Sequence, residues 1–497
     1  MFSSAIVARL RRRCGFTAAV RCLLLLAGTA SAVLGQQTSP GGQPAPQRRL
    51  PTRAAPSTDL LITGGTVVTM DAAHRVLEDG AVAVRDAVIQ AVGPRAALEA
   101  QYPHARRIDA RGRIVLPGFI NTHTHAAMTL LRGVANDMTL EDWLTQRIFP
   151  AEKRNVTEDF VVWGTRLAAL EMIEGGTTTF ADMYYFEDAA ARETKAAGLR
   201  GVLGESVIDF PSPDSPSVDQ SLALIEKYLA RWKDDPLIRP AVAAHSVYTC
   251  SADTLKRSAA LARRWNAPLL IHVLETRRER DEIVEKHHMS SVAWLDSLGF
   301  LGPDVLAAHC VWVDEADIRL LAARGAGCAH NPSSNAMLAS GVAPVPAMLA
   351  AGLRVGLGTD SPAGSNNDLN MMEEMDLAAK LQKVSRLDPK ALTAWQALEM
   401  ATIGGARALH WEDQIGSLEP GKQADIILLR AETAHSVPAY DVAAAIVYSM
   451  KASDVETVIV AGRVLMENRR TLTLDPASIL SKAHEYAAKV RRSLETP

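Results

Sequence analysis

Hydrophobic and polar positions divide the chain into two β-rich ends and a long middle in which strand-like and helix-like patterns alternate. Eight short apolar runs in the middle are separated by amphipathic stretches of helical period. Strands that alternate with helices form a parallel sheet, and eight such units close into a (β/α)8 TIM barrel. The predicted strands are the run that ends at His125 and the runs 176–183, 200–208, 239–245, 267–272, 305–309, 325–330 and 354–360, and the clearest predicted helices are 158–174, 218–232, 252–265 and 314–324.

The two chain ends contain short β-like runs with turn signals between them. They lie at 59–70, 80–84 and 87–93 near the start, and at 424–429 and 455–465 near the end. Two β-rich ends around one long middle predict a small β-sandwich domain built from both. The boundaries that the pattern predicts are 59–117 and 414–475 for the two parts of the β-sandwich, 118–413 for the barrel and 476–497 for a C-terminal helix or tail.

The apolar run 113–120 leads into two histidines that are separated by one threonine. We interpret this run as a buried strand. His123 and His125 then occupy positions i and i+2 and lie on the same face, so that both imidazoles can reach one divalent cation. An isolated pair of this kind more often packs in the core or faces solvent, and the prediction therefore depends on the rest of the chain.

Six of the eight predicted strands end in His or Asp, and the C-terminal strand ends form the face on which barrel enzymes carry their chemistry. Three histidines and one carboxylate on this face suit a zinc ion with an open position for water. Zinc lowers the pKa of a bound water to about 7, so that hydroxide is available at neutral pH. The predicted ligands are His123, His125, His272 and Asp360.

Three further residues are candidates for moving protons and orienting the water. Glu275 follows His272 by three residues and is placed for general acid/base catalysis. His309 ends the next predicted strand and, with Asp360, is expected to orient the attacking oxygen. Taken singly, these residues have other interpretations: Glu275 as a helix-entry carboxylate, Asp360 as a helix cap, and His245, His309 and His330 as core histidines. The joint pattern is what favours one site.

Composition and charge narrow the function classes. The chain has 497 residues, is 48% hydrophobic and carries a formal net charge of −3, so it can bury a large core and is not suited to hold nucleic acid. Residues 1–35 run from basic through apolar to small residues, which is the order of a secretory signal peptide, although a disordered basic N-terminus is the alternative. We therefore expect an exported protein, periplasmic or secreted, without a stable membrane anchor.

Residues 36–58 are rich in Pro, Gln, Gly and Arg and are predicted to form a flexible linker. Behind the predicted signal peptide only Cys250, Cys310 and Cys328 remain. Three cysteines do not make a disulfide framework, so stability must come from the core.

Six motifs in a fixed order carry a family resemblance: Pro117–His125, Ile271–Thr276, Ala308–His309, His330–Asn335, Gly358–Asp360 and Ser365–Asn367. The chain resembles the amidohydrolase superfamily over residues 59 to about 475, and within it the cytosine deaminase and triazine chlorohydrolase branch. It is most similar there to 5-methylthioadenosine/S-adenosylhomocysteine deaminases. The resemblance implies a barrel of amidohydrolase type and a mononuclear zinc or iron site at the four predicted ligands, with Glu275 and His309 in the roles given above.

The resemblance also implies substrate contacts from Glu152 and His245, and Trp143 matches a position that can lie against the base. Members with two metals carry a bridging lysine at the end of the fourth barrel strand. This chain has His245 there, so a single ion is expected. The alternatives for the three residues are a surface Glu, a core His and a packed Trp.

The sequence departs from the relatives at three places. The segment 209–216 after the third barrel strand lacks an arginine for the homocysteine carboxylate. Met337 stands where lysine is common, and Gly364 adds a residue before the motif 365–367. An exported nucleoside deaminase would also be unusual in this branch.

Three hypotheses follow. The leading one is hydrolytic deamination of an adenine-type nucleoside, namely 5-methylthioadenosine, adenosine or S-adenosylhomocysteine, with release of ammonia. The second keeps the site but hydrolyses a cyclic amide, an imide or a halogenated heterocycle. The third is a barrel without catalytic activity that binds a ligand. This hypothesis predicts that one or more of the four metal ligands is replaced, and the sequence shows no such replacement. The oligomeric state is left open, a homo-oligomer being one alternative.

Overall fold

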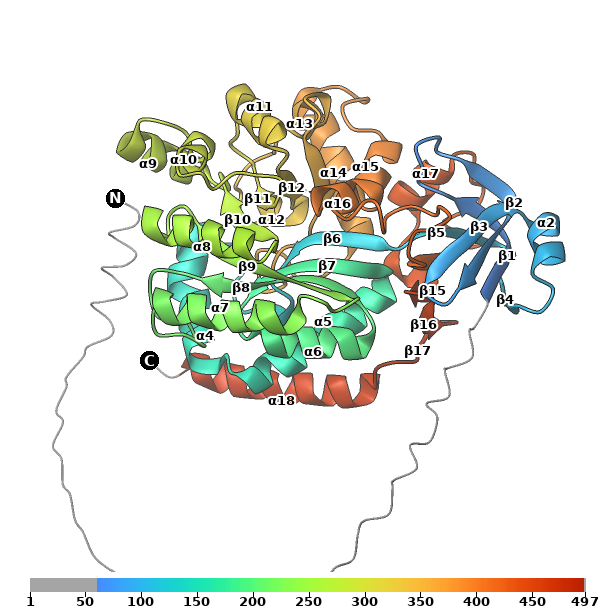
Figure 1. Ribbon diagram of the computed structural model, residues 1–497, viewed down its shortest axis with the longest axis horizontal. Coiled ribbons are helices and arrows are strands. Elements are labelled where there is room, and N and C mark those ends of the chain that lie inside the picture. Colours follow the sequence, from blue (N-terminus) through green and yellow to red (C-terminus); the bar gives the residue numbers. More distant parts are fainter. Residues whose placement is uncertain (1–59, 496–497) are drawn as a thin grey trace, which may run out of the picture.

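The core of the molecule is a closed barrel of eight parallel strands surrounded by helices (Figure 1). The computed structural model describes residues 60–495. The strands follow one another in chain order, and β13 closes the barrel by pairing with β6 through Leu357 and Asn121. All eight strands were predicted from the apolar runs. Their bounds are β6 Phe119–Thr124, β7 Thr177–Tyr184, β8 Arg200–Val207, β9 Ile238–Ser246, β10 Leu269–Val273, β11 Val305–His309, β12 Gly327–His330 and β13 Arg354–Leu357.

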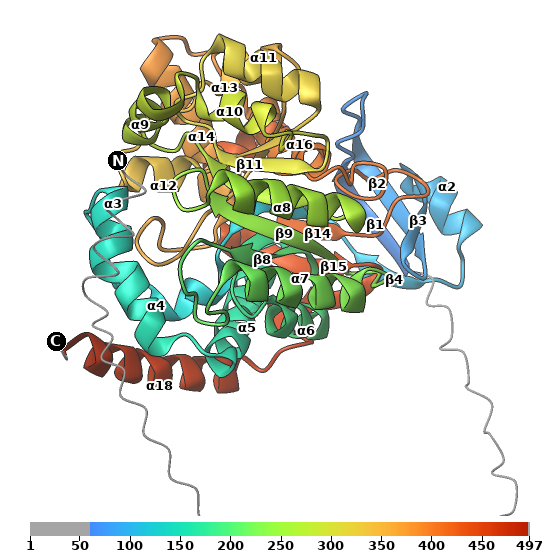
Figure 2. The ribbon, with the colours of Figure 1, turned by 60° about the vertical axis from the view of Figure 1, so that its left-hand side comes forward.

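Helices follow the strands and cover the outside of the barrel (Figure 2). The four predicted helices correspond to α5, α7, α8 and α11. They begin where a Thr, Ser or Asp side chain accepts a hydrogen bond from the first turn, as Thr157, Ser217 and Ser251 do. The bounds are η1 Ala126–Leu131, α3 Leu140–Asp142, η2 Trp143–Ile148, α4 Phe149–Asn155, α5 Glu158–Gly175, α6 Glu187–Ala197, α7 Val218–Trp232, α8 Ala252–Arg264, α9 Arg277–His287, α10 Ser291–Ser297, α11 Glu315–Arg324, α12 Pro332–Met337, α13 Val345–Ala350, α14 Met371–Arg386, α15 Ala394–Met400 and α16 Ile403–Ala408.

The β structure of the two chain ends forms one separate sheet of nine strands, which confirms a small domain built from both ends. Strand β5 from the N-terminal part pairs antiparallel with β14 from the C-terminal part, and buried side chains from both parts form one hydrophobic cluster. The bounds are β1 Leu60–Val68, β2 Val76–Arg85, β3 Val88–Pro94, α2 Arg95–Gln101, β4 Arg106–Asp109, β5 Arg113–Pro117, β14 Ile426–Arg430, α17 Val442–Ala444, η3 Ala445–Ser449, η4 Ala452–Asp454, β15 Val455–Val460, β16 Arg463–Glu467 and β17 Arg470–Thr471.

The run 113–120 was predicted as one strand, and this prediction was wrong. The run 113–120 is divided at Gly118 between β5 of the small sheet and β6 of the barrel. The backbone N–H of Gly118 still donates to the carbonyl of Asp425, in register with the pairing of β5 and β14, whereas that of Phe119 donates to the carbonyl of Gly176 just before β7. The run 455–465 is a hairpin of β15 and β16 with a turn at residues 461–462. Continuous apolar character marks burial, but it does not reveal a change of sheet.

A buried ion pair joins the barrel to the small sheet. Arg200, at the start of β8, is 2% exposed and its Nε lies 2.6 Å from Oδ2 of Asp425. Oδ1 of the same aspartate accepts from the N–H of Ala461 in the small sheet. A charge pair that is this well satisfied fixes the relative position of the two sheets more than it adds stability.

The last helix, α18 (Pro476–Glu495), packs along α5 and α4 (Figure 1). Its Tyr486 donates a hydrogen bond to Asp159, and its Ser493 contacts Asn155 of α4. Among residues 60–495 no helix combines the length and the apolar character needed to cross a bilayer. The predicted signal peptide and linker lie outside the described residues.

Candidate metal centre and active site

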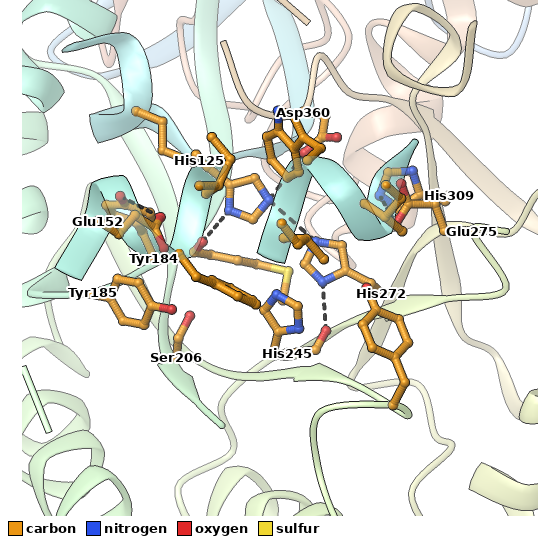
Figure 3. A pocket seen from close by; sticks show the side chains of 18 residues that line it. His125, Glu152, Tyr184, Tyr185, Ser206, His245, His272, Glu275, His309 and Asp360 are labelled. Atoms are coloured by element: carbon orange, nitrogen blue, oxygen red, sulfur yellow. Dashed lines mark hydrogen bonds and ion pairs between the residues drawn. The ribbon is translucent and has the colours of Figure 1, made fainter. Parts of the chain in front are cut away.

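The four predicted metal ligands converge at the C-terminal ends of the barrel strands, and three of them, His125, His272 and Asp360, are labelled in Figure 3. One ligand atom of each lies within 4.8 Å of those of the others. The Oδ1 atom of Asp360 is 3.3 Å from Nε2 of His123 and 3.2 Å from Nε2 of His125. The Nε2 atom of His272 is 3.4 Å from that of His125. The fold brings these four side chains together although they span 238 positions, from 123 to 360.

The strands β6, β10 and β13 bring the ligands together. His123 and His125 stand at the end of β6, and His272 stands in β10. Asp360 follows β13 in a left-handed conformation with φ of 61°, and its N–H donates to the carbonyl of His123. A non-glycine residue in this conformation costs free energy, and such strain is typical of functional positions.

Hydrogen bonds fix the orientation of the ligands. The Nδ1 atoms of His125 and His272 each lie 2.6 Å from a backbone carbonyl oxygen, that of Met183 and that of His245. A carbonyl can only accept, so each Nδ1 carries the hydrogen and each Nε2 presents a lone pair to the centre. Ser334 donates to Oδ2 of Asp360 at 2.6 Å.

The donor set fits a divalent ion. His123 is 1% exposed, yet its Nε2 has no hydrogen-bond partner among the described residues. Burial of an unpaired polar atom is costly, and a metal at the point where the four donors meet would remove that cost. Borderline ions such as zinc prefer this combination of imidazole and carboxylate.

The pKa values of the four ligands also bear on whether this site can bind a cation. Burial alone would raise the pKa of Asp360, but the imidazoles of His123 and His125, which lie 3.3 and 3.2 Å from its Oδ1, outweigh it and hold the pKa well below its usual range. Burial lowers the pKa of His123 to about 4. Burial would lower the pKa of His125 as well, but the hydrogen bond and charge of Asp360 raise it. A divalent ion takes its histidine ligands as neutral imidazoles and its aspartate as a carboxylate, and the lowered pKa values of His123 and Asp360 meet both requirements.

Glu275 and His309 lie beside the metal set. Glu275 is 2% exposed, and its Oε2 is 3.8 Å from Nε2 of His309. Burial, and then the charge of Asp360, raise the pKa of Glu275 well above its usual value, so the carboxyl can hold a proton at neutral pH. The Nδ1 atom of His309 is 3.0 Å from Oδ1 of Asn335, which turns Nε2 toward Glu275.

Sequence reasoning missed the residue that holds Glu275 in place. Glu279 accepts hydrogen bonds from the N–H groups of Leu274 and Glu275, at 2.7 and 3.1 Å, where Leu274 has a φ of 49°. Thr276 caps α9 and stands three residues before Glu279. This Thr-x-x-Glu spacing is that of a capping box, and it was the available signal.

A cavity of about 570 Å³, a volume that includes the open space at its mouth, lies over the centre. All three predicted substrate contacts line it, namely Glu152, His245 and Trp143. Tyr184 donates to Oε1 of Glu152 at 2.8 Å, and Nε1 of Trp143 donates to the carbonyl of Ala363 at 3.1 Å. Burial raises the pKa of Glu152 to about 7. The apolar part of the lining is Met128, Leu140, Leu144, Ile148, Phe149 and Met183, and the polar part includes Tyr185 and Ser206.

One wall of this cavity comes from residues 126–155, which we call the β6–α5 segment. It comprises η1, α3, η2 and α4, and η2 is a π-helix, a form that is frequent at functional sites. The sequence did not predict this wall beyond Glu152 and Trp143, because its apolar positions follow no single period.

Three singled-out positions lie elsewhere. His330 is buried but does not line the cavity, and neither of its ring nitrogens has a hydrogen-bond partner among the described residues. Met337 is 40% exposed at the end of α12. Gly364 has a φ of 109°, and a Cβ there would lie 1.5 Å from the carbonyl oxygen of Ala135. The glycine is needed where the loop after β13 meets the β6–α5 segment.

Comparison with known proteins gives a consistent result. The sequence profile of the amidohydrolase family matches residues 114–465. A 5-methylthioadenosine/S-adenosylhomocysteine deaminase of Syntrophobacter fumaroxidans is 46% identical over 87% of this chain and 98% of its own. An adenosine deaminase from Xanthomonas campestris, solved with bound zinc, superposes with a TM-score of 0.86 at 38% identity, covering 87% of this chain and 99% of its own. An atrazine chlorohydrolase from Arthrobacter aurescens, complexed with zinc, gives a TM-score of 0.81 at 26% identity, covering 86% and 100%.

Proposed function

The chain belongs to the amidohydrolase family, and from this premise we propose that it deaminates an adenine-type nucleoside by hydrolysis. The substrates in view are 5-methylthioadenosine, adenosine and S-adenosylhomocysteine. The observation that carries the proposal is the position of Glu275, a buried carboxyl beside four convergent metal donors in one cavity, with an Oε1 atom that has no hydrogen-bond partner among the described residues. Similar deaminases, named above, support the choice of substrate class.

The cofactor we propose is a single divalent ion, zinc first and iron as the alternative. Its ligands would be His123, His125, His272 and Asp360, the one group of this kind among residues 60–495. When bound, such an ion lowers the pKa of a coordinated water toward about 7 and so supplies the nucleophile. Support comes from the zinc in the similar adenosine deaminase. Elemental analysis of the purified protein tests the identity and number of the ion.

The chain's own residues then divide the remaining work. Glu275 takes one proton from the attacking water and gives it to the ring nitrogen next to the amino-bearing carbon. It then takes the second proton from the hydroxyl on that carbon and gives it to the amino group, which leaves as ammonia. His309 and Asp360 orient the water. The overall balance is one water consumed and one ammonia released for each amino group replaced by a carbonyl.

The opposite side of the cavity binds the rest of the nucleoside. Glu152 accepts hydrogen bonds from sugar hydroxyls, and Tyr184 holds its carboxyl for that purpose. The Nδ1 atom of His245 lies 2.9 Å from Oγ1 of Thr249, so its other nitrogen is directed to the ring. Trp143 lies against the base. These contacts hold the reacting carbon over the metal and limit access of other water.

A nucleoside panel tests this function. Purified protein reconstituted with zinc is incubated with adenosine, 5-methylthioadenosine, S-adenosylhomocysteine, guanosine and cytidine, and ammonia is measured. We expect release from the adenine nucleosides and its loss in Glu275→Gln. No ammonia from any aminopurine would contradict the proposal.

A second candidate is supported by the similarity to the atrazine chlorohydrolase. The same centre could hydrolyse a halogenated heterocycle or a cyclic amide, because a buried acid beside an activated water serves either leaving group. The products discriminate: chloride or a ring-opened acid in place of ammonia.

We also propose export, to the periplasm or the medium, on the basis of the basic, apolar and small-residue order of residues 1–35. Expression of the full chain followed by cell fractionation and N-terminal sequencing of the mature protein tests this. Protein that stays in the cytoplasm with its first residues intact would exclude it.

A further inference from the structure

The cavity offers negative and neutral groups to a substrate but no lysine or arginine. Its charged lining residues, apart from the histidines, are Glu152, Glu275 and Asp360. Hydrolysis fixes the amino-bearing end of the nucleoside at the metal centre. The other end must therefore lie against the rest of the lining, which is apolar, aromatic or hydroxylic except for Glu152 and His245.

The substituent at the 5′ position separates the substrates in view. In 5-methylthioadenosine it is a neutral thioether, whereas in S-adenosylhomocysteine it ends in a carboxylate and an ammonium group. A carboxylate that leaves water needs a cation or several donors in return, and without them the cost is large.

The segment after the third barrel strand makes the same wall more acidic. Where residues 209–216 lack arginine, they supply Asp214, whose Oδ2 accepts from the N–H of Phe186 at 2.8 Å. Glu205, the residue before Ser206 on β8, is 2% exposed and accepts from the N–H of Glu187 at 2.7 Å. The charges of both acids help to raise the pKa of Tyr185, which lines the cavity.

Burial and neighbouring carboxyls are the leading causes of the pKa shifts in this region, and no lysine or arginine is among them. Burial, and then the neighbouring carboxyl of Asp214, raise the pKa of Glu205 well above its usual value. Burial, followed by the charges of Glu152, Asp214 and Glu205, raises the pKa of Tyr185 well above its usual value too. An environment that resists ionisation of its own acids also resists the carboxylate of a ligand.

The lysine and arginine residues of the β6–α5 segment do not supply a positive charge to the cavity lining. All of them are exposed, and none lines the cavity: Arg132, Arg147, Lys153 and Arg154. Arg278 reaches the segment from α9, but it forms ion pairs with Glu141 and Glu282. A ligand carboxylate at the rim would have to compete with both.

We propose that the cavity selects adenine nucleosides with an uncharged 5′ substituent and discriminates against those that end in a carboxylate. The proposal rests on the proposed function and narrows it to 5-methylthioadenosine, adenosine and neutral analogues. The wall that sets this selectivity consists of the β6–α5 segment together with Tyr185 and Ser206.

Two substrates that differ in one charge test it. S-Adenosylhomocysteine and its carboxamide have the same size and the same ammonium group, and only the acid is charged at the carboxyl position. We expect kcat/KM for the carboxamide to exceed that for the acid by about 100-fold, because the acid buries a carboxylate without a partner. Equal values would overturn the selectivity and leave deamination standing. No ammonia from any nucleoside would overturn the proposed function, and this inference with it.

A matched pair of variants locates the effect. Leu144 lines the cavity from η2, and Leu144→Lys adds a cation there while Leu144→Gln adds length and polarity without charge. We expect the lysine variant to narrow the gap between acid and carboxamide by about tenfold, as one partner for a carboxylate should, and the glutamine variant to leave it unchanged. Because each variant is read as a ratio of two substrates, a partial loss of folding does not affect the result. A gap that both variants leave intact would contradict the assignment to this wall.

Discussion

The two sides of the cavity are built in different ways. The metal side consists of residues at or just after strand ends, and backbone carbonyls fix the histidines His125 and His272. The opposite side comes mainly from the β6–α5 segment, which contains short helices and one π-helix. The difference teaches that the fixed barrel carries the chemistry while a connection that can vary carries the choice of substrate.

If this division holds, a substitution at Glu275 should affect turnover far more than binding. Glu275→Gln keeps the shape but removes the proton carrier, and we expect kcat to fall by about 1000-fold, within the usual range for a general acid/base. Steady-state kinetics and metal analysis of the same sample measure this, with metal content unchanged because Glu275 is not in the ligand set.

The control for this prediction is Glu285→Gln, an exposed glutamate on α9 of the same connection, which should keep full activity. A Glu275→Gln variant that raised KM and left kcat intact would place this residue with the binding side and break the comparison.

The second prediction concerns the support behind the metal set. Ser334 donates to Oδ2 of Asp360, so Ser334→Ala should weaken metal affinity by about 10- to 100-fold, the range found for such outer partners. Competition with a chromogenic chelator measures the affinity. Ser334→Thr keeps the hydroxyl and should restore most of it. A normal affinity in Ser334→Ala would show that the strand ends alone fix the ligand.

The same division explains what the sequence could predict. The barrel strands and the candidate site residues from His123 to Asp360 could be predicted because the apolar runs end at the C-terminal face of the barrel, where catalytic residues lie in such folds. The residue type at each strand end can be read directly from the sequence. The position of Glu275 could be read from its distance to His272, but the role of Glu279 in holding the loop could be found only in the structure.

The remainder was not predictable for a physical reason. The β6–α5 segment has no single hydrophobic period, so nothing in the sequence indicated that Leu140 and Leu144 face a cavity. Likewise, the run 113–120 is equally apolar in both sheets that it enters, and only the hydrogen bonds of Gly118 and Phe119 show where one sheet ends and the other begins. Patterns report burial, and they do not report the partner against which a residue is buried.

On the binding side, Glu152→Gln should raise KM by about tenfold with little change in kcat, as expected for loss of one charged hydrogen bond to substrate. The pH dependence sharpens this. Burial raises the pKa of Glu152 from 4.5 to about 7, so the carboxylate that accepts sugar hydroxyls forms as the pH rises through 7. The wild-type KM should therefore fall between pH 6 and 8, relative to the variant.

The stability change has the opposite sense. The folded protein binds the proton of Glu152 more tightly than the unfolded chain does, so this residue's contribution to the free energy of unfolding decreases as the pH rises from about 4.5 to about 7. Denaturant unfolding of wild type and Glu152→Gln across this range measures the difference.

For the binding prediction, the contradicting outcome is a KM that depends on pH in the same way in wild type and in Glu152→Gln. That result would exclude Glu152 from substrate binding.

The smallest effect is expected at Trp143, where the β6–α5 segment meets the loop after β13. Trp143→Phe keeps an aromatic ring in the cavity but removes the hydrogen bond from Nε1 to the carbonyl of Ala363. The loss of one such bond costs about 1 kcal/mol, which corresponds to roughly a fivefold change in an equilibrium constant. We expect kcat/KM to fall by about that factor, and hydrogen exchange of residues 136–148 to become faster. Trp163→Phe on α5, whose ring stacks on Arg166, is the control and should change neither. If Trp143→Phe instead lowered kcat as strongly as Glu275→Gln, the segment would take part in the chemistry and the two sides could no longer be separated.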